Sequence, residues 1–332
     1  MLKKTPLVSV LIPMFNVEPY IEKALLSITR QTYSNLEVII VDDYSSDLSV
    51  EIVNSFISCH CDLDFKFFIN DKNMGVSFVR NKLVGNALGD LLVFLDSDDY
   101  FDNDAIEYLV DLIHYNKTSI GQSLYYSESP GGKTVGQTND FFSTQPLQGK
   151  EAVFAMLEGK ITGYLWHKIF SKELFENINF DLNLPVFEDY EVIMKMFING
   201  ASISFGNERK YHYIQHPMSL TKQSFKNALN RLIYLERTKL LVSPLVITES
   251  DKLRLANHEN TVALMVFINA IKYGAPKYNV IKIKHYINSL SYSKLYKLMS
   301  LKKIIAVLML KFFPSFLYLV LKMIFKIKRK IA

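Results

Sequence analysis

Short aliphatic runs alternate with amphipathic segments over the first hundred residues of the chain. The runs have the length of buried strands and are bounded by polar or turn-forming residues; they are Leu7–Ile12, Glu37–Val41, Phe65–Ile69 and Leu91–Leu95. Between them, apolar residues recur at helical spacing in Glu18–Gln31, Leu48–Ile57 and Val76–Asn86. This alternation predicts a mostly parallel sheet flanked by helices, in which ligands bind at the carboxyl ends of the strands.

The pattern of apolar residues becomes less regular after the fourth run. We predict a helix at Asp102–Tyr115, a mobile loop rich in Ser, Gly, Pro, Thr and Gln at Ser127–Gln148, and a helix at Glu188–Asn199. Further strands are expected at Trp166–Phe170 and Ala201–Phe205. Beyond about Lys222 the pattern is helical, with breaks at Pro244, at Gly274-Ala275-Pro276 and at Pro314. The chain is therefore expected to form an α/β domain with a helical C-terminal extension.

Charge is distributed unevenly along the chain. Of its 38 Lys and Arg residues, 14 lie between Asn260 and Ala332, a region that contains no Asp or Glu. The preceding residues have a net negative charge. An acidic body with a basic, aliphatic tail favours an anionic membrane surface over nucleic acid as the partner. The alternative is a basic face that is simply solvated.

The tail from Leu301 onward is strongly apolar. Lys311, Pro314 and Lys322 interrupt it, so no run of about 18 uninterrupted apolar residues exists. Lysines at the edges, with Phe and Leu between them, favour helices that lie in the membrane interface. A spanning helix and a purely soluble helical pack remain the alternatives.

The cysteines and the N-terminus bear on the compartment. Cys59 and Cys61 are separated by one residue, a poor geometry for a disulfide, and zinc would require a second cluster of ligands. The N-terminus runs directly into a strand-like segment, without the apolar stretch of about 7 to 15 residues that a signal peptide needs. We expect a cytoplasmic protein, peripheral at the inner face of the cell membrane, whose oligomeric state the sequence leaves open.

Carboxylates follow two of the predicted strands. Asp42, Asp43 and Asp47 follow the second run, and Asp96, Asp98 and Asp99 follow the fourth. In an extended segment Asp96 and Asp98 point to the same side, about 6 to 7 Å apart, so both can address one divalent cation. The alternative is that these residues cap the helices that follow, since Asp is favoured at helix N-termini. Capping explains one carboxylate at each cluster more readily than three.

Paired carboxylates of this kind suit a metal-bound nucleotide. Mg²⁺ or Mn²⁺ held by one or two carboxylates completes its coordination with phosphates and water. Such a metal assists departure of a nucleoside diphosphate by neutralising the developing charge. The Asp-x-Asp sequence is a weak motif alone, and its position at the end of the fourth strand strengthens it.

At these motifs the sequence resembles the family 2 glycosyltransferases of the GT-A fold, over roughly residues 7–221. The matching segments keep their order and spacing; they are VSVLIPMFNVEPYIEKALLSITRQTYSNLEVIIVDDYSSD (8–47), NMGVSFVRN (73–81), GDLLVFLDSDDYF (89–101), WHKIFSKELF (166–175), FEDYEV (187–192) and YHYIQHPMSLT (211–221). The resemblance implies a Rossmann-like sheet and transfer of a sugar from a nucleotide-activated donor.

The resemblance also implies which residues contact the donor. The nucleotide-sugar set comprises Pro13, Asn16, Asp42, Asp43, Asn73, Gly75, Arg80, Asn81, Asp96, Ser97, Ser219 and Thr221. Asp43, with Asp42 beside it, would accept a hydrogen bond from N3–H of uracil. Ser219 and Thr221 match a closing loop near the diphosphate. Asp98 is the implied metal ligand, with Asp96 near both the ribose and the metal.

Asp189 matches the catalytic base of the family. In a single displacement the acceptor hydroxyl attacks opposite the departing diphosphate, a carboxylate takes its proton, and the anomeric configuration inverts. Glu188 is the rival base, and its family role is acceptor binding. Trp166 and Lys168 are further candidates for acceptor contacts, although Trp166 is also a good core residue.

The sequence departs from the family pattern in two places. Phe15 stands where members commonly have Tyr, and Gln215 and His216 stand where they have Arg or Lys. His212, His216 or Lys168 would have to supply that cation to the diphosphate. The Gln-x-x-Arg-Trp motif of the family's processive synthases does not occur in the sequence, which favours transfer of one sugar per acceptor.

The sequence as a whole predicts a GT-A catalytic domain at 1–221 and a helical region at 222–332 whose tail, from about 300, associates with the membrane. Within the domain, 1–100 would bind the nucleotide-sugar and 101–221 the acceptor. The predicted reaction moves a hexose or N-acetylhexosamine from a UDP-sugar to a lipid-linked oligosaccharide in bacterial surface polysaccharide synthesis. The alternatives are a membrane-bound glycan-binding protein with a degenerate site and a sugar-nucleotide pyrophosphorylase.

Overall fold

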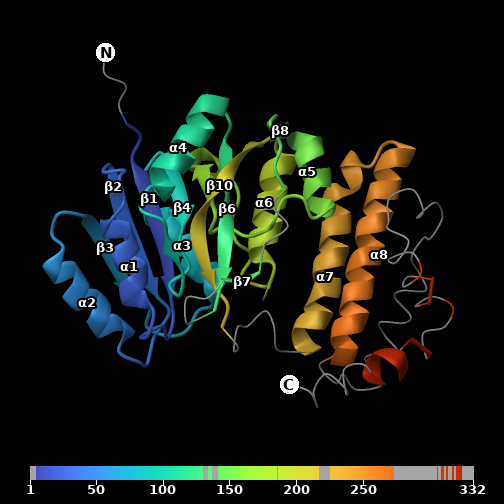
Figure 1. Cartoon of the computed structure of the whole chain (residues 1–332), viewed down its shortest axis with the longest axis horizontal. Coiled ribbons are helices and arrows are strands. Elements are labelled where there is room, and N and C mark those ends of the chain that lie inside the picture. Colours follow the sequence, from blue (N-terminus) through green and yellow to red (C-terminus); the bar gives the residue numbers. More distant parts are fainter. Residues whose placement is uncertain are drawn as a thin grey trace. The chain divides into compact units, whose positions relative to one another are not determined.

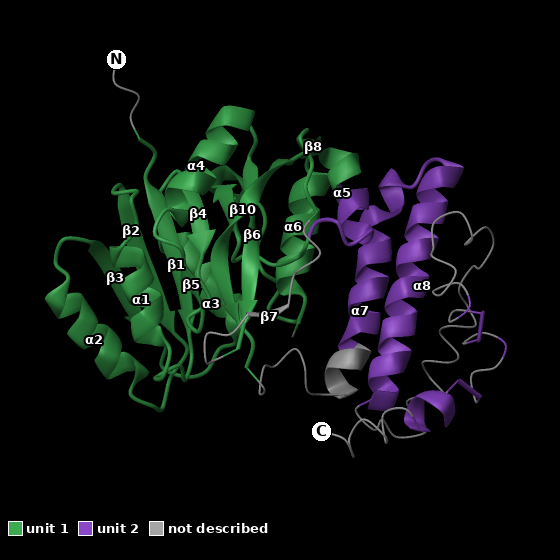
Figure 2. Ribbon diagram, in the orientation of Figure 1, with its two compact units in different colours: residues 1–152, 162–216 green, residues 153–161, 217–332 purple. Residues whose placement is uncertain are grey.

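The computed structural model of the chain describes residues 5–129, 134–136, 141–184, 186–216 and 225–272, with scattered helical positions between 305 and 323 (Figure 1). It divides into two compact units (Figure 2). The first comprises residues 1–152 and 162–216, and the second comprises 153–161 and 217–332. The first unit contains the sheet.

Four parallel strands form one half of the sheet, in the order β3-β2-β1-β4. They are β1 (Val8–Met14), β2 (Leu36–Asp42), β3 (Asp64–Ile69) and β4 (Leu91–Phe94), and they confirm the strands expected from the apolar runs. Helices α1 (Ile21–Thr29), α2 (Ser49–Cys59) and α3 (Val76–Asn86) connect them. Met14 pairs with Asp42, and Leu11 with Phe94, so the carboxyl ends of these strands share one edge.

The other half of the sheet has mixed strand directions. From β4 the order continues β9-β6-β10-β5, where β9 is antiparallel to both neighbours and β10 is parallel to β6. The bounds are β5 (Tyr100–Phe101), β6 (Ile120–Glu128), β9 (Lys168–Ser171) and β10 (Ser202–Ile214). Two short strands, β7 (Thr134–Gly136) and β8 (Leu147–Gln148), pair with β6 and β10. The prediction of a loop at Ser127–Gln148 is therefore wrong where β7 and β8 lie.

Helices complete the first unit. They are α4 (Ala105–Asn116), the start of α5 (Gly149–Leu157) and α6 (Glu188–Ile198), with a 3₁₀ turn at Lys172–Phe175. Alternate strand residues face opposite sides of a sheet. Val10 of β1 accordingly packs in one core cluster with Ile21 of α1, whereas Phe94 of β4 contacts Phe170 and Phe180. The sheet is thus buried on both faces, as a parallel sheet requires.

The described part of the second unit is helical, as expected. Its main elements are α7 (Phe225–Val242) and α8 (Glu249–Lys272), joined through a 3₁₀ turn at Ser243–Leu245. Leu235, Val266 and Phe267 are buried within it. In the part of the chain that the structure describes, none of the helices combines the length and hydropathy that a bilayer crossing requires. Most of the predicted membrane-associating tail lies outside the described residues.

Candidate active site

The loops that follow β1, β2 and β4 meet at the carboxyl edge of the sheet. The amide of Asp43 donates to the carbonyl of Met14 at 2.8 Å, so the ends of β1 and β2 are joined. Asn16, which has φ of +50°, accepts a hydrogen bond from the amide of Ser46 at 2.8 Å through its side chain. The predicted position of the site, at the ends of the strands, matches this convergence of loops.

Two carboxylates of the first acidic loop are satisfied within that loop and its neighbour. Asp42 is fully buried and accepts hydrogen bonds from the hydroxyl of Ser45 at 2.5 Å and from its amide at 2.9 Å. Asp47 accepts from the hydroxyl of Ser49 at 2.5 Å and from the amide of Glu18 at 3.0 Å. Internal donors therefore offset the charge of both groups, and this loop needs no cation.

Asp43 fixes the loop that leads into α3. Its carboxylate accepts from the amides of Met74 and Gly75, both at 2.8 Å, and from the side chain of Asn70 at 2.9 Å. Gly75 has φ of +86°, a conformation that favours glycine. Asp43 is 5% exposed, whereas Asn73, on the loop that leads into α3, is exposed. In this structure Asp43 positions the loop before α3, and Asn73 on that loop is exposed.

The second acidic loop has one carboxylate that is hydrogen-bonded to β10 and two that are partly exposed to solvent. Asp99 is buried and accepts from the hydroxyl of Tyr211 at 2.8 Å and from the amide of Ile214 at 2.7 Å. The side chains of Asp96 and Asp98 are 31% and 37% exposed. Asp99 thus ties the loop to β10, while the two predicted metal ligands remain accessible.

The ionisation of these carboxylates reflects burial and mutual repulsion. Burial raises the pKa of Asp96 to about 6; the charges of Asp98 and Glu188 act in the same direction, and Arg80 opposes them. Burial also raises the pKa of Asp98. Oxygen ligands of this type are those that Mg²⁺ and Mn²⁺ prefer, and a cation would relieve the repulsion. Asp96 and Asp98 therefore fit a divalent metal.

His216 lies beside this pair. Its Nε2 is 3.2 Å from Oδ2 of Asp98, and its ring centroid is 4.5 Å from that of Tyr20. His216 is one of the three residues expected to replace the Arg or Lys that family members have near the diphosphate. This contact places it at the second acidic loop. The described residues hold no group of three or more His, Cys, Asp or Glu side chains arranged to bind a metal. Two protein carboxylates would therefore need phosphate and water to complete the coordination.

Arg80 joins the acidic loop to the start of α6. Its Nη1 forms an ion pair with Oε1 of Glu188, and its Nη2 lies 3.9 Å from Oδ1 of Asp96. The residue is 8% exposed, and its Nε has no hydrogen-bond partner among the residues that the structure describes. Burial would lower the pKa of Arg80, but the charges of Glu188, Asp96 and Asp189 raise it overall. Glu188, predicted to contact an acceptor, is held here by Arg80.

Asp189 is the second residue of α6 and directly follows Glu188 of this ion pair. It is half-buried, and its Oδ1 accepts a hydrogen bond from the amide of Tyr190 at 2.7 Å. Burial, together with the charge of Glu188, raises the pKa of Asp189 to about 7, and Arg80 opposes the rise. A carboxylate with a pKa near neutrality is well matched to general base catalysis.

Lys168 and Trp166, the other predicted acceptor contacts, are buried. Lys168 is fully buried, and its Nζ donates to the carbonyl of Tyr164 at 2.6 Å, to the hydroxyl of Thr162 at 3.0 Å and to Nε2 of His167 at 2.9 Å. Trp166 is 5% exposed. Burial keeps the pKa of Lys168 well below its usual range, against the charge of Asp189. These two side chains therefore support the segment at 162–164 instead of facing an acceptor.

The remaining predicted residues have different placements. Asn81 donates to the carbonyl of Phe180 at 2.8 Å and accepts from its amide at 2.9 Å, so it anchors the segment before α6. Pro13 is half-buried near the carboxyl end of β1, and Ser97 is buried within the second acidic loop. Two predicted residues, Ser219 and Thr221, lie outside the described residues.

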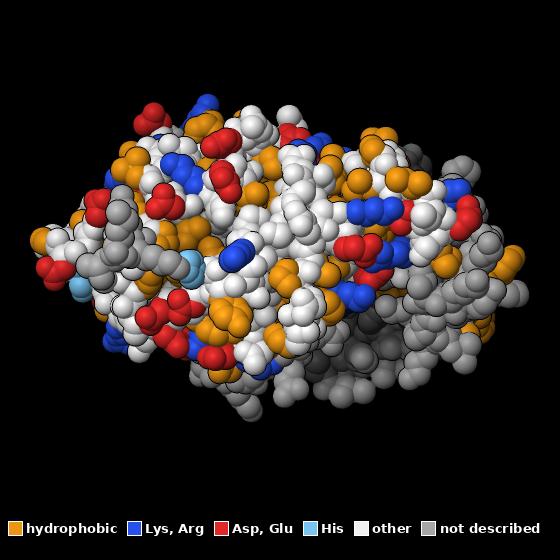
Figure 3. All heavy atoms as spheres, turned by 90° about the horizontal axis from the view of Figure 1, so that it is seen from above, with side chains coloured by type: hydrophobic (Ala, Val, Ile, Leu, Met, Phe, Trp, Pro, Cys, Tyr) orange, Lys and Arg blue, Asp and Glu red, His pale blue; other side chains and the backbone are white. Residues whose placement is uncertain are grey.

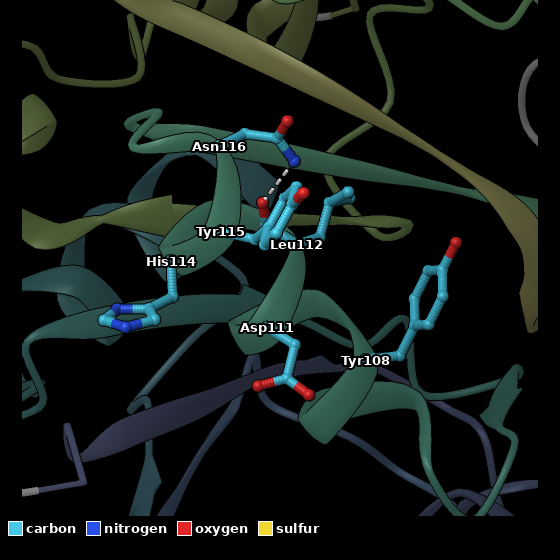
Figure 4. Close-up of a pocket in the computed structure, with 6 residues that line it drawn as sticks. All are labelled: Tyr108, Asp111, Leu112, His114, Tyr115 and Asn116. Carbon is cyan, nitrogen blue, oxygen red and sulfur yellow. Dashed lines mark hydrogen bonds between the residues drawn. The ribbon is translucent and has the colours of Figure 1, made fainter. Parts of the chain in front are cut away.

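A surface hollow of about 430 Å³ on α4 lies apart from these loops (Figure 4). It is lined by Tyr108, Asp111, Leu112, His114, Tyr115 and Asn116, whose side chains point in different directions. Asn116 donates to the carbonyl of Leu112 at 2.8 Å, which satisfies the end of the helix. On the face seen from above, acidic and basic side chains both occur (Figure 3). The acidic loops at the carboxyl edge are therefore the better candidate for an active site.

This sheet order, with an acidic loop after β4 and an acidic start to α6, defines the chain as an α/β protein of the GT-A class. Residues 9–178 match the model described as Glycosyl transferase family 2, and the chain belongs to that family. The fold and the family predicted from the sequence are confirmed.

Similar proteins agree with this assignment. The chain is 30% identical over 230 residues to the uncharacterized glycosyltransferase EpsJ of Bacillus subtilis, a match that covers 68% of this chain and 66% of EpsJ, just under two thirds of that relative. S. aureus TarS 1–349, solved with UDP, has a TM-score of 0.55 at 20% identity, over 84% of this chain and 86% of that one. The mannosyltransferase PcManGT of Pyrobaculum calidifontis, solved with GDP-Man and Mn²⁺, has a TM-score of 0.54 at 16% identity, over 94% and 88%.

Two features of the site were not predicted from the sequence. One is the anchoring of Asp99 by Tyr211, which comes from β10, more than a hundred positions away. The other is Tyr164, an exposed aromatic residue beside Trp166. Tyr164 and Trp166 lie two positions apart in the sequence, and this proximity was the available signal.

Proposed function

We propose that the chain is an inverting, metal-dependent glycosyltransferase that moves one hexose or N-acetylhexosamine from a UDP-sugar to a lipid-linked oligosaccharide. The proposal is carried by one observation: Arg80 links Asp96, in the acidic loop after β4, to the start of α6, where Asp189 lies. A donor held at that loop and an acceptor at α6 would face each other across this link.

The donor side of the site is assigned to the acidic loop. Asp98 and Asp96 would hold Mn²⁺ or Mg²⁺, and the bound metal would supply charge neutralisation at the departing diphosphate. The fold is shared with TarS solved with UDP and with PcManGT solved with GDP-Man and Mn²⁺, which supports a nucleotide-sugar donor. Asn73 and Gly75, on the loop held by Asp43, border the nucleotide in this proposal.

The acceptor side is assigned to the start of α6. Asp189 takes the proton of the attacking hydroxyl, whose oxygen bonds to the anomeric carbon as the bond from that carbon to the diphosphate breaks. Attack on the side opposite the leaving group inverts the anomeric configuration. The ion pair makes Glu188 the weaker candidate for the base, because its carboxylate is already occupied by the guanidinium of Arg80.

The Asp98→Asn variant tests the metal-dependent part of the proposal. We expect its affinity for the UDP-sugar in Mn²⁺ to fall by about 100-fold, because the amide removes the charge that holds the metal. Calorimetric titration with a panel of sugar nucleotides, with and without Mn²⁺, measures this, and UDP release identifies the donor. Asp64→Asn, an exposed residue at the amino end of β3, is the matched control. Equal donor affinity in Asp98→Asn and the wild type would contradict the assignment.

The basic tail is proposed to hold the enzyme at the cytoplasmic face of the membrane, near lipid-linked acceptors. The full chain should co-sediment with vesicles of anionic phosphatidylglycerol and not with phosphatidylcholine. Replacing Lys326, Lys328, Arg329 and Lys330 by Gln should weaken the binding at least about tenfold, since each basic residue contributes about 1 kcal/mol near an anionic surface. Unchanged sedimentation of that variant would argue against an electrostatic anchor, and UDP release verifies that it remains folded.

A further inference from the structure

Trp166 lies within a group of aromatic rings. Its ring is close to parallel with those of Tyr213, Tyr211 and Tyr164, with interplanar angles of 6°, 24° and 16°. The ring centroids lie 5.3, 4.5 and 5.0 Å from that of Trp166. These distances are those of favourable stacked contacts. The rings form a rigid base made of β10 residues and of the segment before β9.

Exposure differs sharply within this group. Trp166 is 5% exposed and Tyr211 is fully buried, whereas Tyr164 is 45% exposed. Tyr164 therefore presents aromatic surface to solvent while Trp166 fixes the orientation of its ring. A large aromatic side chain held in one orientation loses little conformational entropy when a ligand binds to it.

The backbone of this segment is fixed close to α6. A Cβ at Gly163 would lie 2.6 Å from the side chain of Tyr190, so only glycine allows this approach. Tyr190 directly follows Asp189 in α6. From the other side, Nζ of Lys168 donates to the carbonyl of Tyr164 at 2.6 Å, and the charge of Asp189 acts on Lys168. The backbone that carries Tyr164 is thus held against the residue that follows Asp189 in α6.

We propose that Tyr164 is the stacking platform for the acceptor, and that the acceptor group it binds is a pyranose ring with an apolar face. The C–H bonds on such a face carry partial positive charge and are attracted to the negative face of an aromatic ring. Stacking there orients the ring so that one of its hydroxyl groups faces Asp189. This inference rests on the proposed function and extends it to the acceptor.

The test uses binding as well as turnover. Trp166 is the single tryptophan of the chain, and it contacts Tyr164, so its fluorescence reports occupation of the platform. The probes are octyl glycosides of glucose, galactose and N-acetylglucosamine. We expect a saturable fluorescence change in the wild type for at least one of them, retained within about twofold in Tyr164→Phe and weakened at least about tenfold in Tyr164→Ala.

Two controls separate this inference from a general loss of structure. Tyr115→Ala removes another exposed tyrosine, on α4, and should leave the affinity for the glycosides unchanged. The affinity for the UDP-sugar should be the same in all variants. A wild-type chain that binds none of the glycosides, or a Tyr164→Ala variant that binds them normally, would overturn the inference. Absence of UDP-sugar binding and UDP release would instead reject the proposed function.

Discussion

The Asp189→Asn variant is expected to bind the UDP-sugar as the wild type does and to lose about 10²- to 10⁴-fold in transfer rate, the range typical for removal of a general base. The amide keeps the size of the side chain and its hydrogen bond from the amide of Tyr190, but it cannot accept the proton of the acceptor. Donor titration and the rate of UDP release in the presence of acceptor measure the two quantities separately.

The neighbouring carboxylate provides the rival outcome. If Glu188 is the base, Glu188→Gln should abolish transfer and Asp189→Asn should retain it. We expect Glu188→Gln instead to lower the stability of the fold, because Glu188 neutralises the buried Arg80. A loss of donor affinity in Asp189→Asn as large as in Asp98→Asn would contradict the separation of donor and acceptor sides.

The pH profile supplies a second measurement on the same variant. Asp189 must be deprotonated to act as a base, and its pKa is raised to about 7 by burial and by the charge of Glu188. The value of kcat/KM for the wild type should therefore increase as the pH is raised through an apparent pKa near 7, because Asp189 loses its proton over this range. The residual transfer of Asp189→Asn should lack this limb. A wild-type profile that is flat between pH 6 and 8 would exclude Asp189 as the base.

Much of the fold could be predicted because its elements have local signals. The buried parallel strands are continuous apolar runs, and the predicted helix Val76–Asn86 matches α3 at both ends. Strand β10 was predicted too short, at Ala201–Phe205, because the polar residues after Phe205 interrupt the apolar pattern. The pairing with β6 shifts register between Phe205 and Arg209, and the strand continues to Ile214 beyond that irregularity.

The site was less predictable because its side chains have distant partners. Asp42-Asp43 and Asp98-Asp99 are both pairs of adjacent aspartates that follow a strand. Asp43 accepts a hydrogen bond from the amide of Gly75, and Asp99 accepts one from the amide of Ile214. Local sequence shows that acidic residues cluster after a strand. It does not show which of them find internal donors from segments 27 to 115 positions away, and that difference decides which carboxylates remain accessible.

The same limit applies to Trp166 and Lys168. Both residue types are suited to binding an acceptor, but both side chains are buried. Trp166 stacks against Tyr164, and Lys168 donates a hydrogen bond to Thr162. Lys168 is paired in the sheet with Gln122 of β6, a strand that the sequence did not reveal. Without β6, the burial of Lys168 could not be foreseen.

The Arg80→Met variant is expected to lower the free energy of unfolding by about 3–5 kcal/mol, the effect of removing one partner of a buried ion pair. Met fills much of the same volume, so the loss arises chiefly from Glu188, which is 7% exposed and would remain charged without a partner. Chemical denaturation measures it. Arg30→Met, at an exposed site after α1, should change stability by less than about 0.5 kcal/mol.

A double variant distinguishes the ion pair from other effects of losing Arg80. Adding Glu188→Gln to Arg80→Met removes the uncompensated charge, so the double variant should be more stable than Arg80→Met alone. Its transfer activity should nevertheless stay low, because Arg80 also lies 3.9 Å from Asp96 and, through its charge, lowers the pKa of Asp189. If the double variant is no more stable than Arg80→Met, Arg80 stabilises the fold by packing, and the electrostatic link between the donor loop and α6 is unnecessary for folding.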